Sequence, residues 1–246
     1  MRPPPRLLVV LRRRGLAVAA VLLALAASGC DIPRDPDGTL GRVRGGTLRV
    51  GVSENPPFVI REGEATEPRG VEADLVRAFA ADLGATLEWH WGAMHDHVAA
   101  LEQNELDLAA GGLPAASPLA MRVGASQPYY RGHEAIGAPP EASGASWDGA
   151  RVAVPAARAI ASRVEAEGAV PVRVDHPEAA GGFAAAPDWQ LRAWGMRPVH
   201  RLGPAEYVLA VPPGENGMLH RLDLFLAGRQ DWAARALVRD AAARRR

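Results

Sequence analysis

The 246-residue sequence contains no lysine, a single cysteine and few aromatic residues. With Cys30 as the only cysteine, the chain can form no internal disulfide and no metal site built from several cysteines. Its arginines and acidic residues are equal in number, and the formal net charge of +0 creates no broad positive field. This balance argues against a nucleic-acid partner, because nucleic-acid-binding domains carry clustered basic charge.

The N-terminus combines basic residues, an apolar run and the lone cysteine. Arginines within residues 2–14 precede the apolar stretch 16–27, and Ser28, Gly29 and Cys30 follow. This order is typical of a secretory signal, and the run is shorter than the roughly 20 residues of a membrane span. Small residues before a cysteine resemble the bacterial lipobox. We therefore expect a lipoprotein signal peptide over 1–29 and lipidation at Cys30; an uncleaved anchor and ordinary secretion are the alternatives.

The first part of the mature chain alternates predicted strands and helices. Residues 30–46 are polar and rich in proline and glycine, which predicts a flexible tether. Apolar periodicity then predicts strands over 47–52, 86–91 and 106–110, a helix over 71–83 and a short helix that Asp96 can cap. Such alternation favours a mostly parallel sheet flanked by helices.

A second unit of the same kind follows a boundary rich in proline, glycine and serine at 137–149. The pattern predicts strands over 151–154, 170–174 and 207–211, and helices over 156–167, 189–194, 218–226 and 231–244. The chain is therefore predicted to contain two α/β units in series, with the break near residue 140.

Several segments, in order and spacing, resemble one known family. They are GVEADL (70–75), SQPYY (126–130), WDGARVAV (147–154) and EYVLAV (206–211). Together they are similar to the type II periplasmic solute-binding proteins, in the branch that mostly serves amino-acid importers. The resemblance spans nearly all of the chain from Gly46 to the C-terminus.

The resemblance implies a two-lobe α/β fold in which each lobe is a mostly parallel sheet flanked by helices. It places lobe 1 at 47–131 plus 211–246, a shortened lobe 2 at 138–205, and hinge strands at 132–137 and 206–210. A small polar solute would bind between the lobes and shift the balance from open to closed. The expected protein is a monomer without cofactor or catalysis, lipid-anchored outside the cytoplasm, with a membrane permease or another inner-membrane protein as partner.

The sequence departs from the family where the family holds a ligand carboxylate. The family pattern there is Gly-h-Thr-h-Thr-x-x-Arg, whose hydroxyls and guanidinium bind the carboxylate. Gly112 fits, but Pro114 and Ala116 stand at the threonine positions and Leu119 at the arginine position. The usual Gly-Ser or Gly-Thr of the second lobe is also replaced, by residues 155–157. These substitutions argue against a standard amino-acid binder.

Five residues are candidate ligand contacts. Phe58 stands where the family places an aromatic ring over the ligand, although it could be a loop aromatic packed on its own lobe. Glu54 lies at the carboxyl end of the first strand, where open α/β sheets bind ligands. Gly112 and Arg122 belong to the altered carboxylate segment, and Arg122 could instead be a solvated surface side chain. Asp188 resembles the acid that holds a ligand ammonium, or it is a helix N-cap.

Other readings of the sequence remain open. His90, His95 and His97 with Asp96 suggest a metal site, but their spacing does not place them on one helix face, and we expect none. One alternative function is a ligand-free sensor or accessory module that contacts a membrane protein. Another is a prephenate-type dehydratase-like enzyme, which would need basic groups for carboxylates and a placed acid or base.

Overall fold

The computed structural model describes residues 35–63, 66–142, 144–156 and 160–244. The expected signal peptide at 1–29 and the lipidation site Cys30 lie outside these residues. No helix in the described ranges is long and apolar enough to span a membrane.

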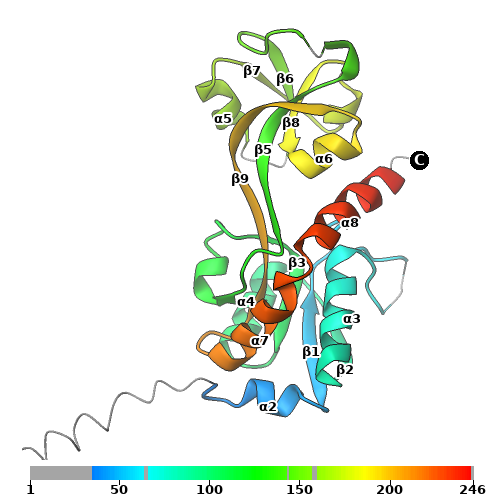
Figure 1. Ribbon diagram of the computed structural model, residues 1–246. Coiled ribbons are helices and arrows are strands. Elements are labelled where there is room, and N and C mark those ends of the chain that lie inside the picture. The colour runs from blue at the N-terminus through cyan, green and yellow to red at the C-terminus, as the bar shows by residue number, and fades with distance from the viewer. Residues whose placement is uncertain (1–34, 64–65, 143, 157–159, 245–246) are drawn as a thin grey trace, which may run out of the picture. The chain divides into compact units, whose positions relative to one another are not determined.

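Within the described residues, nine strands form one continuous sheet. Their order is β2-β1-β3-β9-β5-β8-β6-β7, and the short β4 pairs with β9. The strands are β1 (Thr47–Val52), β2 (Thr86–Trp91), β3 (Leu108–Pro114), β4 (Gly124–Ala125), β5 (Tyr130–Ala138), β6 (Arg151–Pro155), β7 (Val170–Val174), β8 (Phe183–Pro187) and β9 (Arg197–Val211). The helices, labelled in Figure 1, are α2 (Thr39–Val43), α3 (Val71–Leu83), α4 (Met94–Glu102), α5 (Ala161–Ala166), α6 (Asp188–Ala193), α7 (Asn216–Ala227) and α8 (Gln230–Ala243).

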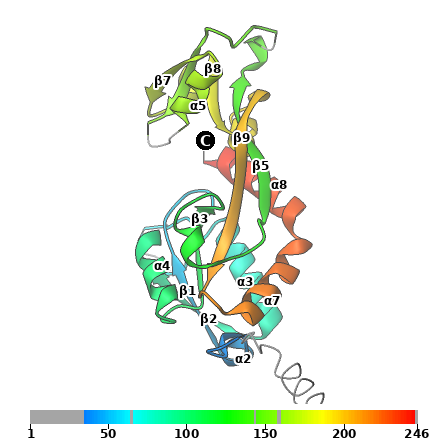
Figure 2. The ribbon, with the colours of Figure 1, turned by 90° about the vertical axis from the view of Figure 1, so that its left-hand side faces the viewer.

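In the first lobe, β1 runs parallel to β2 and β3, and β9 pairs antiparallel with β3. Alternate residues of β3 and β9 belong to different apolar clusters, because successive strand residues point to opposite faces of a sheet. Leu108 and Leu209 pack in a cluster with α3, α7 and α8. Ala109 and Val208 pack in another with Leu101 of α4. Helices therefore cover both faces of this part of the sheet, as Figure 2 also shows.

The second lobe repeats this arrangement. β6 runs parallel to β7 and β8, and β5 pairs antiparallel with β8. Ile136 and Val152 pack with Val164 of α5 on one face. Ala135 packs with Leu191 of α6 on the other face. The expected architecture, two α/β lobes that are each a mostly parallel sheet flanked by helices, is confirmed, and the strands of the two lobes belong to one continuous sheet.

β5 and β9 are the long strands that run between the two lobes (Figure 1). They pair antiparallel from Tyr130 opposite Tyr207 to Ala138 opposite Arg197. Their register shifts twice, once between Glu134 and Ala135 and again between Ile136 and Gly137. Each bulge changes the face of the two-stranded ribbon to which the β9 side chains beyond it, toward Arg197, point.

Most elements match the sequence prediction, and the differences have physical causes. α4 begins at Met94 with Ala93 as its N-cap and Asp96 within its first turn, so the expectation that Asp96 caps this helix is wrong. β9 begins at Arg197, ten residues before the predicted strand at 207–211. β8 was not predicted because its core is three consecutive alanines, a run without the period-two contrast of a strand.

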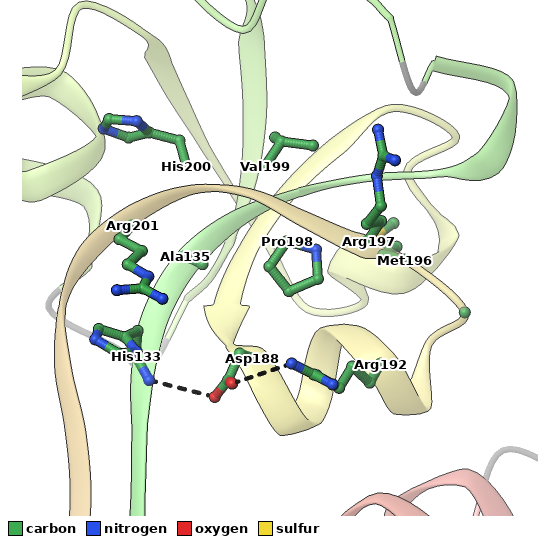
Figure 3. Close-up of a pocket in the computed structure, with 11 residues that line it drawn as sticks. His133, Ala135, Asp188, Arg192, Met196, Arg197, Pro198, Val199, His200 and Arg201 are labelled. Carbon is green, nitrogen blue, oxygen red and sulfur yellow. Dashed lines mark hydrogen bonds and ion pairs between the residues drawn. The ribbon is translucent and has the colours of Figure 1, made fainter.

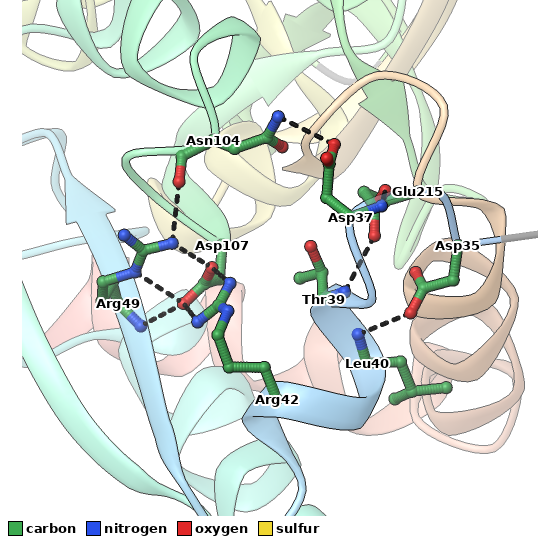
Figure 4. Close-up of polar contacts among 9 residues, drawn as sticks. All are labelled: Asp35, Asp37, Thr39, Leu40, Arg42, Arg49, Asn104, Asp107 and Glu215. Atoms are coloured by element: carbon green, nitrogen blue, oxygen red, sulfur yellow. Dashed lines mark hydrogen bonds and ion pairs between the residues drawn. The ribbon is translucent and has the colours of Figure 1, made fainter.

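The tether predicted over 30–46 contains an ordered helix. Asp107 accepts hydrogen bonds from the Arg42 and Arg49 side chains, and this buried carboxylate ties α2 to β1 (Figure 4). Both oxygens of the buried Glu215 accept backbone N–H groups of the same segment, from Asp37 at 2.9 Å and Thr39 at 3.0 Å. The composition of this segment could not predict the helix, because the residues that hold it, Asp107 and Glu215, lie far away in the sequence.

Candidate functional site

A cavity of about 520 Å³ lies between residues of the two lobes, and we call it the cleft cavity. The first lobe contributes the loop after β1 and the end of β3, and the second lobe contributes α5. β5 and β9 form its back wall. The lining residues are Asn55, Phe58, Gly112, Pro114, Ala115, Ala116, Glu134, Arg163, Pro204, Ala205, Glu206 and Tyr207.

Phe58 forms the aromatic part of this lining. The loop that carries it is held at both ends: the Asn55 side chain donates to the Gly111 carbonyl at 2.9 Å, and the Phe58 carbonyl accepts the Glu72 N–H at 2.9 Å. The Phe58 ring is 1% exposed and lies 4.5 Å from the Tyr207 ring and 5.5 Å from the Trp189 ring. Phe58 therefore lines the cavity, as a ligand-facing aromatic residue would, and it also packs against neighbouring rings, as a loop aromatic would.

Gly112 is the residue that lets β3 pass close to Phe58. Its φ is +71°, a backbone conformation that residues other than glycine rarely adopt. A Cβ at this position would lie 2.5 Å from the Phe58 ring and 2.6 Å from the Asn55 amide. The site therefore requires glycine, for backbone geometry as well as for space.

A buried carboxylate on α3 binds the backbone of the same strand. Glu72 is 0% exposed, and its Oε2 accepts the N–H groups of Gly111 and Gly112. Its Oε1 accepts the hydroxyl of Tyr129. Burial raises the pKa of Glu72 to about 7, although these three hydrogen bonds partly oppose the rise. Glu72 is a functional candidate that the sequence shows only as part of the family-like segment 70–75.

The charged groups of the cleft cavity come mainly from the second lobe and the connecting strands. Arg163 of α5 donates to Oε2 of Glu134 at 2.5 Å, and that glutamate is 19% exposed. Glu206 adds a second carboxylate. Sequence reasoning named none of the three as a ligand contact. Glu134 and Arg163 belong to no motif, Glu206 lies in the segment 206–211 that was used only for the family resemblance, and the three come together only in the tertiary fold.

The altered carboxylate segment does face the cavity. Pro114, Ala115 and Ala116 line it with apolar atoms. Leu119 instead packs against the apolar cluster beneath α4. The first lobe thus offers the cavity the Asn55 amide and no charged side chain among its lining residues.

The other predicted ligand residues lie elsewhere. Glu54 is exposed and is not among the residues that line the cavity. Arg122 forms a two-pronged ion pair with Glu102, at 2.8 and 2.6 Å, away from the cavity lining. Of the five candidates, the structure places Phe58 and Gly112 together.

Asp188 has a different position. It is the first residue of α6, where Pro187 and not Asp188 is the N-cap, so the capping alternative is wrong. Its Oδ1 accepts hydrogen bonds from the Tyr130 hydroxyl at 2.5 Å and from the His133 N–H at 3.3 Å. Asp188 lines two other cavities and not the cleft cavity.

The histidines suspected of metal binding are dispersed. His97 is buried, and its ring lies against Gly51 and Gly92. Burial lowers the pKa of His97. His90 pairs with Glu88, and His95 pairs with Asp96. Within the described ranges, no group of three or more potential metal ligands comes together.

Comparison with characterised proteins gives partial relatives. Membrane-bound lytic murein transglycosylase F of Thiobacillus denitrificans is 37% identical over 112 residues, which cover 43% of this chain and 22% of that protein. The protein of the same name from Maricaulis maris is 37% identical over 121 residues, 47% of this chain and 26% of that protein. The matches thus span about a quarter of the length of these relatives.

Solved structures match over most of the chain. The L-cystine solute receptor of Neisseria gonorrhoeae, in its unliganded open conformation, has a TM-score of 0.67 and 17% identity, and covers 83% of this chain and 98% of that chain. The B. pertussis BvgS periplasmic domain has a TM-score of 0.65 and 20% identity, and covers 85% of this chain and 45% of that chain. The TM-scores show a shared fold.

The match to a protein family is broader than the matches to the two lytic murein transglycosylases. The model of the bacterial extracellular solute-binding proteins, family 3, matches residues 48–231. That range takes in both lobes and every residue of the cleft cavity. The chain belongs to the bacterial extracellular solute-binding proteins of family 3, and it has their two-lobe type II periplasmic fold.

Proposed function

We propose that this protein captures a small polar solute in the cleft cavity. The observation that carries the proposal is the composition of the cavity: an aromatic side from Phe58 and Tyr207, and a charged side from Glu134, Arg163 and Glu206. A volume of about 520 Å³ lies within the range of small-molecule sites, roughly 300–1,000 Å³.

The charges favour a solute that carries both an ammonium and a carboxylate. Two carboxylates, of Glu134 and Glu206, and one guanidinium, of Arg163, line the cavity. Arg163 is available to a ligand carboxylate because its side chain is 48% exposed and its present partner is Glu134. An amino acid would place its carboxylate on Arg163 and its ammonium on Glu134. The second lobe would then supply the charged contact that Pro114 and Ala116 of the first lobe do not.

The role outside the cytoplasm rests on the N-terminal sequence and on the family. We propose lipidation at Cys30 and a membrane permease, of the ABC-importer type, as the partner. Metabolic labelling of cells with a radioactive fatty acid tests the lipid anchor: wild type should take up the label, and Cys30→Ser, which lacks the acylated thiol, should not. A wild-type protein without label, or a Cys30→Ser variant that is labelled equally, would contradict lipidation at Cys30.

A thermal-shift screen tests solute capture. The panel holds the amino acids, polyamines, organic acids and small sugars, each applied to the wild-type protein and to Arg163→Ala. A solute at about a hundredfold its dissociation constant stabilises the folded state by roughly 2.7 kcal/mol, a shift of several degrees for a domain of this size. A shift in the wild type that shrinks in Arg163→Ala supports the proposal, and a panel without any shift contradicts it.

One observation favours a second candidate, a module that binds no solute and contacts a membrane protein. Trp189 of α6 packs edge-on against Phe58 at 5.5 Å and is 2% exposed, so the second lobe already contacts the aromatic side of the cleft. We do not propose an enzyme, because the cleft carboxylates of Glu134 and Glu206 are paired with Arg163 and Arg131, and the apolar segment 114–116 offers no acid or base.

A further inference from the structure

A second cavity, of about 530 Å³, lies on the other face of the connecting strands (Figure 3). Glu134 of β5 faces the cleft cavity, whereas its neighbours His133 and Ala135 line this second cavity. The alternation follows from the strand geometry, in which successive side chains point to opposite faces. The two cavities are therefore separate, and we call the second one the basic cavity.

A β-bulge places one arginine in the basic cavity. Glu134 pairs with Gly203, but the next residue, Ala135, pairs with Arg201, so Leu202 is the extra residue. Without the bulge, Arg201 would lie opposite Ile136, on the face of the ribbon that Glu134 shares. With it, Arg201 lies opposite Ala135 and lines the basic cavity. Bulges are known to redirect side chains in this way.

The basic cavity has an excess of positive charge. Arg192 of α6, and Arg197 and Arg201 of β9, line it together with the single carboxylate of Asp188. With the histidines neutral, these groups sum to a charge of +2. The whole chain has a formal net charge of +0, so the excess is a local feature and not a reflection of composition.

The carboxylate in this cavity is already satisfied. Oδ1 of Asp188 accepts the Tyr130 hydroxyl and the His133 N–H, and Oδ2 lies 3.8 Å from Arg192. By contrast, the Arg201 guanidinium has no hydrogen-bond or ion-pair partner in the described part of the chain. Figure 3 shows Arg201 and His133 on one side of the cavity and Arg192 on the other.

We infer that the basic cavity is a second binding site, for a small oxyanion with two negative charges. Guanidinium groups bind carboxylate and phosphate oxygens through parallel N–H donors, which suits Arg201 and Arg192. A dicarboxylate and a phosphate share this chemistry. The inference does not depend on the solute of the cleft cavity, because the two cavities have no lining residue in common.

Isothermal titration of the purified protein with inorganic phosphate and, separately, with succinate tests the inference. The two probes distinguish a compact tetrahedral anion from an extended dicarboxylate. The variants are Arg201→Ala and the double variant Arg192→Ala with Arg201→Ala. The matched control is Arg151→Ala, because Arg151 is an exposed arginine of β6 outside the cavity.

Saturable binding of at least one probe is expected. Arg201→Ala should weaken it about tenfold, the double variant should weaken it further, and Arg151→Ala should leave it unchanged, since a hydrogen bond to a charged group contributes about a factor of ten or more. Three results would overturn the inference: no saturable binding of either probe, equal losses in Arg151→Ala and Arg201→Ala, or binding abolished by the cleft variant Arg163→Ala.

Discussion

The hydroxyl of Tyr129 donates a hydrogen bond to Glu72, whose other carboxylate oxygen holds the N–H groups of Gly111 and Gly112. Tyr129 immediately precedes β5, and Gly112 lines the cleft cavity. One buried carboxylate of α3 therefore connects the start of a strand that runs between the lobes with the wall of the solute site.

The stability of the protein should depend on the protonation of Glu72. Its pKa is about 7 in the folded protein and near 4.5 as an ordinary glutamate. A raised carboxylate pKa means that the folded state binds the proton more tightly. Glu72 thus stabilises the fold at low pH, and this contribution, roughly 3 kcal/mol at most, is lost as pH rises from 4.5 through 7.

Urea unfolding of the wild type and of Glu72→Gln between pH 4 and 8 measures this dependence. The neutral amide should remove the part of the pH slope that belongs to Glu72, so that the variant gains stability relative to the wild type as pH rises. Glu141→Gln, at an exposed glutamate of the 3-10 helix 140–142, is the charge-matched control. Parallel curves for wild type and Glu72→Gln would contradict the assignment.

Gly112→Ala should destabilise the protein and disturb the cleft cavity. Gly112 and Gly181 have nearly the same φ, +71° and +70°, but a Cβ meets Phe58 only at Gly112 and has open space at Gly181. Both substitutions carry the cost of a left-handed alanine, about 1–2 kcal/mol. Chemical unfolding should show a larger loss for Gly112→Ala. Equal losses would mean that the contact with Phe58 relaxes freely.

Asp107→Asn should weaken the attachment of α2 to the first lobe. Burial alone raises the pKa of Asp107, but hydrogen bonds from Arg49 and Arg42 outweigh it and hold the pKa below its usual value. The ionised carboxylate therefore adds stability at neutral pH, and this is lost as pH falls through the lowered pKa. Because the Arg42 and Arg49 side chains are 44% and 29% exposed, water can solvate their charges in the variant, and the loss at neutral pH should be about 1.5–3 kcal/mol.

Acid unfolding of Asp107→Asn and of the exposed-pair control Asp240→Asn tests this prediction. Asp240 pairs with Arg239, whose side chain is 63% exposed, so its loss should change the unfolding free energy by less than about 1 kcal/mol. Asp107→Asn should be less stable at pH 7 and approach the wild type in acid. A difference that stays constant down to pH 2 would contradict the role of the Asp107 charge.

Much of the fold could be predicted because its periodic signals are strong. The bounds of β1, α3, β2 and β7 equal the predicted ones, since each has a clear apolar pattern. The N-terminal half of β9 could not be predicted, because Gly203 and Pro204 interrupt it and its partner β5 supplies the pairing. α2 was missed because its stabilising carboxylates, Asp107 and Glu215, are distant in the sequence.

The candidate site was only half predictable. Phe58 and Gly112 lie in segments with a recognisable pattern, and both line the cleft cavity. Glu134 and Arg163 are 29 positions apart and belong to no motif, so their ion pair exists only through the tertiary fold. Arg201 reaches the basic cavity through a bulge, a shift of register that the sequence does not signal.

The most direct test of solute capture is isothermal titration with each of the twenty L-amino acids. Wild type is compared with Arg163→Ala, which removes the proposed carboxylate partner, and with Arg201→Ala, which lies outside the cleft. We predict one-to-one binding of at least one amino acid, weakened about tenfold or more by Arg163→Ala and unchanged by Arg201→Ala. Binding of none, or binding that Arg163→Ala leaves unchanged, would contradict the account.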